Sequence, residues 1–299
     1  MSLDALSRRD VKTSLGVVPV WSAPEIFASR RPLLLAIAGL FAGADDLSRL
    51  PEVMAPVADA AILRIPGSGP PPLREASLEG FARAVGELIG QQFADRPVVL
   101  LGVSIGAAAA LGVRAPAVRR IVAVEPILAT GELWPLEGPV RAHLRGLPRG
   151  HPSHDLYWRL FGLDAERCAA RDHGGLLKGL SVPVDVLLAG QPLAPERKLE
   201  GFPSLVPEAL HARLAALPQV RLHQAPGAGH NVQAAAGKQL TELLFEACRR
   251  AAADAPHEAR GLDEPLLEAT PLGASRIAHW GPGGPAFAGA YLGWNPTAE

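Results

Sequence analysis

The chain has 299 residues, which suits one large domain or two of ordinary size. Hydrophobic residues make up 48% of it and charged residues 20%, and this composition excludes an intrinsically disordered chain. The formal net charge of −1 gives no bulk electrostatic basis for binding nucleic acid or an anionic membrane. We therefore expect a small-molecule partner and neither nucleic acid nor a membrane.

Cysteine usage and the N-terminus indicate a reducing compartment. Cys168 and Cys248 do not form a CxxC pair, so they predict neither a disulfide scaffold nor a zinc site. Residues 1–16 mix acidic and basic side chains and lack the apolar centre of a signal peptide. The longest apolar stretch, 97–113, is interrupted by glycine and serine and is too short to span a membrane. A cytoplasmic location is the expectation.

The first third of the chain predicts a hairpin followed by strands and helices. Residues 11–15 and 17–21 read as two strands joined at Gly16. The continuous apolar run 32–38 predicts a strand buried on both faces, as in a parallel sheet. A helix at about 46–58 and a strand at 60–65 follow.

The middle of the chain alternates helix and strand with short connections. Helices are expected at about 77–93 and 105–113, and strands at 98–103 and 120–124. This alternation is typical of an α/β protein with a mostly parallel central sheet flanked by helices.

After the strand at 120–124 the regular pattern is lost. Residues from about 130 to 180 are rich in Trp, His, Arg and Pro and predict an inserted lid with short helical pieces. The pattern returns with strands at 182–189 and 220–224, a helix near 207–217 and a final helix at about 234–252.

The pentapeptide Gly102-Val-Ser104-Ile-Gly106 is a G-x-S-x-G motif. It follows an apolar strand directly and opens an Ala-rich helix directly, the setting in which a tight turn exposes a serine hydroxyl above a sheet edge. This pattern predicts that Ser104 is a nucleophile. The alternative is that Ser104 is merely a small residue in a tight strand-helix turn.

From residue 10 to about 250 the chain resembles the α/β-hydrolase family. Besides the serine motif, the segment Ala225-Pro-Gly-Ala-Gly-His230 is similar to the family's histidine segment after the last core strand. The resemblance implies that His230 is the general base that takes the proton of Ser104 and returns it to the leaving group. It also implies an oxyanion hole made by the amides of Ile105 and of Leu40 or Phe41.

The acidic partner of His230 is not where the family usually carries it. Residues 190–195, after the penultimate strand, contain no carboxylate, and Ala38 replaces the family's usual histidine before Gly39. Glu125, at the end of the strand after the nucleophile helix, is the favoured substitute, because some lipases keep their acid at the corresponding place. Glu196, or no carboxylate at all, are the alternatives.

The lid carries two further groups of residues. His151, His154 and Asp155 are close in sequence but lack convergent partners, so they predict a polar loop and no metal site. Aromatic and aliphatic side chains of the lid could line an apolar pocket above Ser104 or pack with one another. These residues are Trp134, Trp158, Leu160 and Phe161.

A boundary is expected near residue 252. Residues 1–252 would form the hydrolase-like domain, and 253–299 a linker and C-terminal extension. Residues 266–289 faintly resemble the opening of a class I methyltransferase domain, but Pro282 and Pro285 remove amide donors that a cofactor loop would use. No cofactor is therefore expected. The extension is interpreted as part of a longer polypeptide or as a remnant that packs on the hydrolase or on another subunit, and the alternative is an ordinary Gly/Pro-rich tail.

These features predict a serine hydrolase acting on a carboxylic ester or thioester. The expected catalytic residues are Ser104, His230 and Glu125, with the amides of Ile105 and Leu40 as oxyanion donors and no metal. A homo-oligomer, or a fused or partner domain at the C-terminus, is a further expectation. The rival hypothesis is a non-catalytic hydrolase-like module that binds a ligand or partner. Residues 190–195 and Ala38 favour this rival.

Overall fold

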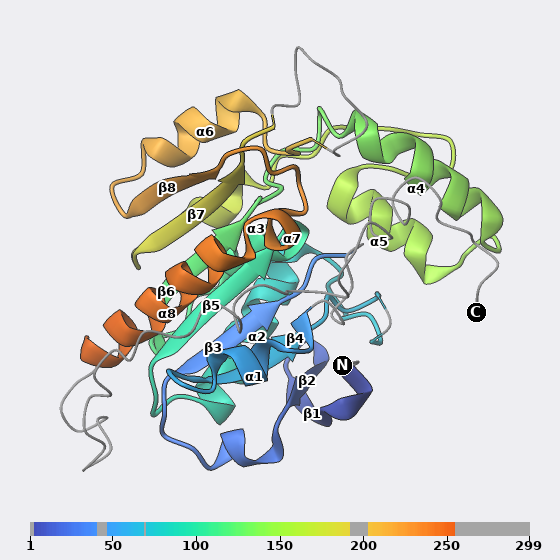
Figure 1. Cartoon of the computed structure of the whole chain (residues 1–299). Helices are drawn as coiled ribbons and strands as arrows, with labels where there is room; N and C mark the ends of the chain where they lie inside the picture. The colour runs from blue at the N-terminus through green and yellow to red at the C-terminus, as the bar shows by residue number, and fades with distance from the viewer. Residues whose placement is uncertain (1–2, 41–46, 69, 192–202, 255–299) are drawn as a thin grey trace.

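The fold is built on one eight-stranded sheet with the order β1-β2-β4-β3-β5-β6-β7-β8 (Figure 1). The computed structural model describes residues 3–40, 47–68, 70–191 and 203–254. The strands are β1 (Ser7–Thr13), β2 (Gly16–Ser22), β3 (Leu33–Ile37), β4 (Asp59–Leu63), β5 (Val98–Val103), β6 (Val118–Val124), β7 (Val184–Ala189) and β8 (Val220–Ala225). Pairing is antiparallel between β1 and β2 and between β2 and β4, and parallel from β4 through β8. The expected α/β class with a mostly parallel sheet is confirmed.

Most of the helices lie in the connections between strands, and the last two follow the last strand. The helices are α1 (Leu50–Met54), α2 (Leu78–Gln92), α3 (Ile105–Gly112), α4 (Trp134–Gly146), α5 (Pro152–Phe161), α6 (Glu208–Ala215), α7 (Val232–Ala235) and α8 (Gly237–Ala253), with short 3-10 turns η1 (Leu3–Ala5), η2 (Pro24–Phe27) and η4 (Gly174–Leu177). In the described part of the chain, no helix has the length and apolar character needed to cross a membrane.

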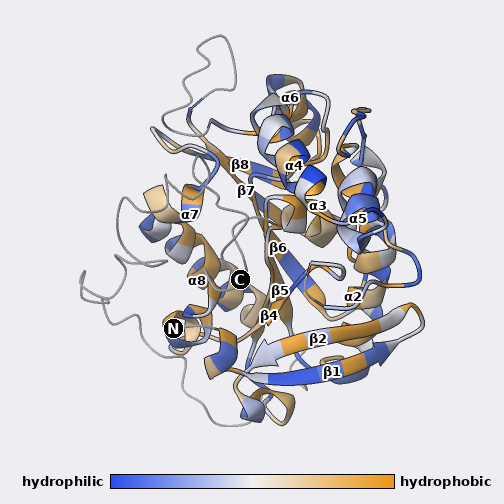
Figure 2. Ribbon diagram, turned by 90° about the vertical axis from the view of Figure 1, so that its right-hand side faces the viewer, coloured by the Kyte–Doolittle hydropathy of each residue, from blue (hydrophilic) through white to orange (hydrophobic). Residues whose placement is uncertain are grey.

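The sheet is buried between two helical layers because its central strands are apolar on both faces. All five residues of β3 are fully buried. Leu33, Leu35 and Ile37 pack with α2 and α3, whereas Leu34 and Ala36 face the cluster of α1 and α8. Figure 2 shows α8 on one side of the sheet and α2 and α3 on the other. This double coverage explains the continuous apolar runs of the sequence.

Several element boundaries differ from the predicted ones. The hairpin turn lies at Ser14 and Leu15, because Gly16 already pairs with Thr13. Of the helix expected at 46–58, α1 occupies five residues. The final helix is divided at Ala236, whose φ of −127° is not helical, so α8 begins at Gly237. The expected extension at 253–299 lies outside the described residues except for the end of α8 and Asp254.

The segment between β6 and β7 contains more helix than expected, in α4 and α5 (Figure 1). Its base is closed by an antiparallel bridge between Ala129 and Asp172, and the Thr130 amide donates to the Arg171 carbonyl at 3.0 Å. We call residues 130–172 the insertion. Leu156 of α5 lies against the segment that follows β4, since a Cβ on Gly67 would be 3.4 Å from Leu156 Cδ1. The insertion therefore contacts a loop that leaves the carboxyl edge of the sheet.

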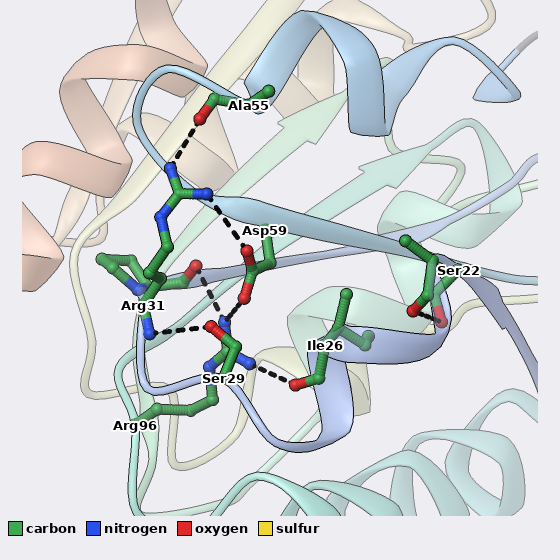
Figure 3. A network of polar contacts seen from close by, with 9 residues as sticks. Ser22, Ile26, Ser29, Arg31, Ala55, Asp59 and Arg96 are labelled. Carbon is green, nitrogen blue, oxygen red and sulfur yellow. Dashed lines mark hydrogen bonds and ion pairs between the residues drawn. The ribbon is translucent and has the colours of Figure 1, made fainter.

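A buried ion pair joins the segments at the opposite, amino-terminal edge of the sheet (Figure 3). Arg96, only 3% exposed, pairs with Asp59 at the start of β4 and donates to the Ile26 carbonyl at 2.7 Å. Arg31 reaches the same carboxylate at 3.3 Å. Burial lowers the pKa of Arg96, and the contact with Asp59 opposes that shift. Arg96 thus links the start of β4 to the segment before β3, and this network holds the amino-terminal ends of the strands together.

Candidate active site

Ser104 occupies a sharp turn between β5 and α3. Its φ of 58° and ψ of −125° lie in a region that residues with a side chain rarely adopt. The Ser104 amide donates to the Val124 carbonyl at 2.8 Å, which ties the turn to the end of β6. The side chain is 7% exposed. The turn therefore holds one hydroxyl at the carboxyl edge of the sheet, next to the N-terminus of a helix.

The two glycines of the motif are needed for steric reasons. A Cβ on Gly106 would overlap the Ile37 carbonyl oxygen and lie 2.6 Å from that of Ala38. A Cβ on Gly102 would overlap Ala107 Cα in the first turn of α3. Both clashes are with backbone atoms, which cannot move away as a flexible side chain would. The G-x-S-x-G spacing thus follows from the close approach of α3 to β3 and β5.

His230 reaches Ser104 from the loop between β8 and α7. Its Nε2 lies 3.0 Å from Ser104 Oγ, and the side chain is buried, with 7% of the residue exposed. The ends of β7 and β8 lie side by side, because the Gly190 amide, directly after β7, donates to the Ala225 carbonyl of β8 at 2.9 Å. The loop that carries His230 therefore starts at the carboxyl edge of the sheet. The expected serine-histidine contact is present in the structure.

Glu125 lies behind His230, at the end of β6. Glu125 Oε2 is 3.1 Å from His230 Nδ1, and the residue is fully buried. Its φ of 49° is also positive, and its amide donates to the Leu187 carbonyl of β7 at 3.0 Å. The favoured candidate, Glu125, is therefore in contact with His230. Glu196 lies outside the described residues.

The Glu125 carboxylate receives hydrogen bonds from three more donors. The Ala189 amide donates to Oε1 at 2.7 Å and the Leu205 amide to Oε2 at 3.0 Å. Ser204 Oγ is 3.0 Å from each carboxylate oxygen. Sequence reasoning missed these contacts. The available signal was weak: Ser204 is a polar residue inside the otherwise apolar run Phe-Pro-Ser-Leu-Val.

The geometry of these contacts suits removal of the Ser104 proton. A buried carboxylate needs hydrogen-bond donors, and Glu125 has them in Ala189, Ser204 and Leu205. His230 Nδ1 lies beside the Glu125 acceptor and Nε2 beside Ser104 Oγ. With the ring proton on Nδ1, facing Glu125, the lone pair of Nε2 faces the Ser104 hydroxyl.

The backbone beside Ser104 offers hydrogen-bond donors for an anion. Ile105 is the first residue of α3, so its amide has no partner within the helix. Gly39 is adjacent to the serine, because a Cβ on Gly39 would lie 3.3 Å from Ser104 Cβ and 3.9 Å from its Oγ. Leu40 follows Gly39 directly and is partly buried, whereas Phe41 lies outside the described residues.

The aromatic residues of the insertion pack within it. The guanidinium groups of Arg167 and Arg171 lie over the Trp158 ring, at 4.5 and 4.6 Å from its centroid. Leu160 and Phe161 are each 1% exposed and belong to the main core. Of the two predicted uses of these side chains, these contacts correspond to packing. The side chain of Trp134 lies outside the described part of the structure.

The candidate metal ligands of the insertion serve local structure. His151 Nδ1 accepts from the Ser153 amide at 3.2 Å and so begins α5, while Asp155 pairs with Arg159. No group of three or more His, Cys, Asp or Glu in the described ranges could hold a metal ion. Cys248 is buried and its pKa is raised to about 12, which makes its thiol a poor nucleophile.

Comparison with solved structures supports the architecture. The chain is similar to AbyA5, with 22% identity, a TM-score of 0.55, and 83% of this chain and 70% of that chain covered. It is also similar to carboxylesterase NP, a naproxen esterase from Bacillus subtilis, with 15% identity, a TM-score of 0.55 and coverage of 81% and 90%. For N-formylmaleamic acid deformylase from Pseudomonas putida the identity is 17%, the TM-score 0.56 and the coverage 80% and 99%. No family model matches the sequence, and no curated protein matches it significantly.

Proposed function

We propose that this chain, which has the α/β-hydrolase fold, is a serine hydrolase that cleaves carboxylic esters or thioesters through an acyl-enzyme on Ser104. One observation carries the proposal: Ser104 Oγ, His230 and Glu125 form a continuous chain of contacts of 3.0 and 3.1 Å. Contacts of this length are those that a nucleophile, its base and the base's partner require.

In the first half of the reaction Ser104 Oγ attacks the carbonyl carbon of the substrate. The hydroxyl proton passes to His230 Nε2, and the carbonyl oxygen becomes an oxyanion. Collapse of the tetrahedral intermediate breaks the bond to the alcohol or thiol, which leaves with the proton held by His230. An ester of Ser104 remains.

In the second half a water molecule replaces the leaving group. His230 takes one proton from the water while the hydroxide attacks the acyl carbon. The acid product departs as the bond to Ser104 Oγ breaks, and His230 returns the proton to that oxygen. Proton and electron counts close over the cycle, so the proposed reaction uses no cofactor.

The backbone donors would stabilise the oxyanion formed in both halves. The amide of Ile105, at the N-terminus of α3, is one donor, and the amide of Leu40, next to Gly39, is the other. Gly39 avoids a side chain whose Cβ would lie 3.3 Å from Ser104 Cβ and 3.9 Å from its Oγ. We propose the insertion as a lid over this edge, because Leu156 of α5 contacts the loop after β4.

A fluorophosphonate probe tests the proposal directly, because it reacts only with a serine that has an activated hydroxyl. We expect one adduct per chain on Ser104, read by intact mass and peptide mapping. The adduct should be absent in Ser104→Ala and lost or strongly slowed in His230→Ala. Hydrolysis of p-nitrophenyl acetate and of an acyl thioester would then separate esterase from thioesterase activity.

Failure of this experiment has a defined meaning. If folded wild-type protein forms no adduct, Ser104 is not activated, and the rival hypothesis of a binding module gains. The residues that favoured this rival were the absent acid at 190–195 and Ala38. The contact of Glu125 with His230 removes the first of these arguments.

A further inference from the structure

We infer that Ser204 is a positioning residue of the site, holding the Glu125 carboxylate oriented toward His230. The inference rests on the proposed function and deepens it. Ser204 is 2% exposed, and its Oγ lies 3.0 Å from both carboxylate oxygens of Glu125. It is a side-chain donor to this carboxylate besides His230 itself.

The other contacts of the Ser204 hydroxyl are both with Val206. The Val206 amide donates to Ser204 Oγ at 3.1 Å, which uses a lone pair of that oxygen, and the Val206 carbonyl is an acceptor at 3.5 Å. The Glu125 oxygens, at 3.0 Å, are the nearer acceptors for the hydroxyl proton, and the Leu205 amide supplies a parallel donor to the carboxylate at 3.0 Å. Residues 204–206 therefore present two donors to Glu125, one from a side chain and one from the backbone.

Ser204 is also tied to the loop that carries His230. Its amide donates to the Gln191 carbonyl at 2.9 Å. Gln191 in turn donates through its amide to Ala228 at 2.9 Å and through Nε2 to the Gly227 carbonyl at 2.7 Å. Gln191 thus holds both Ser204, which donates to Glu125, and the loop that carries His230. This link helps to set the distance between Glu125 and His230.

This arrangement explains why no acid is needed after β7. The resemblance described above would have an acid in the segment that follows the penultimate strand. Here the described parts of that segment, Gln191 and residues 203–206, contribute hydrogen-bond donors instead. The acid, Glu125, follows β6, and Ser204, which lies after β7 in the chain, donates a hydrogen bond to it.

The test compares fluorophosphonate labelling rates and ester hydrolysis in matched variants. Ser204→Ala should lower both the labelling rate and kcat about 10- to 100-fold, the effect of losing one hydrogen bond to a charged group, with KM unchanged. Ser22→Ala is the matched control, because Ser22 is 1% exposed and donates to the Ala23 carbonyl in a distant strand. It should leave both rates within about 2-fold.

A structural role alone is separated by two further comparisons. Ser204→Thr keeps a hydroxyl and Ser204→Val does not, at nearly equal volume, so Thr should retain at least about 10-fold more activity than Val. In a Glu125→Ala background, Ser204→Ala should change the residual rate less than about 2-fold, because no carboxylate is left to hold.

The outcomes distinguish the two hypotheses. If wild type is labelled on Ser104 and Ser204→Ala is labelled at the same rate, the role of Ser204 is wrong and the hydrolase proposal stands. Equal losses in the Thr and Val variants, or an undiminished effect in the Glu125→Ala background, would also overturn it. If the wild type is not labelled at all, both proposals fail together.

Discussion

Two neighbouring parallel strands, β5 and β6, are each followed by a residue with positive φ, yet different interactions stabilise the two turns. Ser104 follows β5 and Glu125 follows β6, and each amide donates to a carbonyl of the next strand of the sheet. Ser104 is flanked by Gly102 and Gly106, whose missing side chains make room for backbone. Glu125 has no such glycines and is followed by Pro126.

The difference lies in what compensates the unfavourable backbone. At Ser104 the turn depends on local space: Gly102 and Gly106 have no side chains, which lets the backbone pack closely. This requirement appears in the sequence as the spacing of the two glycines. At Glu125 it is the set of hydrogen bonds that the buried carboxylate accepts from Ala189, Ser204, Leu205 and His230. A local device leaves a motif in the sequence, whereas contacts from distant segments leave none.

Removing the charge at the second turn should have the largest effect. We expect Glu125→Gln to lower kcat about 10⁴-fold, since the neutral amide can donate to Nδ1 and favour the wrong tautomer of His230. Steady-state kinetics on p-nitrophenyl acetate measures it. Glu242→Gln is the control, because Glu242 is exposed on α8 and only 3.9 Å from Lys238; it should be neutral. Activity within about 10-fold of wild type would remove Glu125 from the mechanism.

Filling the space at the first turn comes next. Gly106→Ala should lower the free energy of unfolding by about 3 kcal/mol, because its Cβ meets the Ile37 and Ala38 carbonyls. Urea unfolding measures this. The matched control is Gly90→Ala in α2, where a Cβ has no neighbour within 4 Å and helix propensity should add about 0.5–1 kcal/mol. Equal midpoints for the two variants would contradict the steric account of the motif.

The smallest effect isolates backbone strain at Ser104. Ser104→Gly should be about 1 kcal/mol more stable than Ser104→Ala, because glycine adopts φ of 58° without penalty. Both variants lack the nucleophile, so activity does not enter the comparison. At Gly90 the order is reversed and alanine should be the more stable residue. If alanine is also favoured at 104, the turn carries no strain.

Most of the sheet could be predicted from the sequence, because each strand is a short apolar run bounded by turn residues. The insertion was predicted less well. Its α4 contains Gly138, Pro139 and Gly146, and residues of this kind normally argue against a helix, so packing in the described fold overrides propensity there. The one-residue break between α7 and α8 at Ala236 was not predicted either.

The sequence by itself determined the nucleophile turn as a candidate, because a tight turn requires particular residues at fixed spacing, and the family resemblance implied the histidine loop. It left Glu125, Glu196 or no carboxylate as alternatives for the acid, and it carried only a weak sign of Ser204. Tertiary structure decided that Glu125 contacts His230 and that Ser204 contacts Glu125, across sequence separations of 105 and 79 residues. The physical reason is that a buried carboxylate takes its donors from whichever strands end beside it. That set of neighbours is fixed by the order of strands in the sheet, which no local pattern encodes.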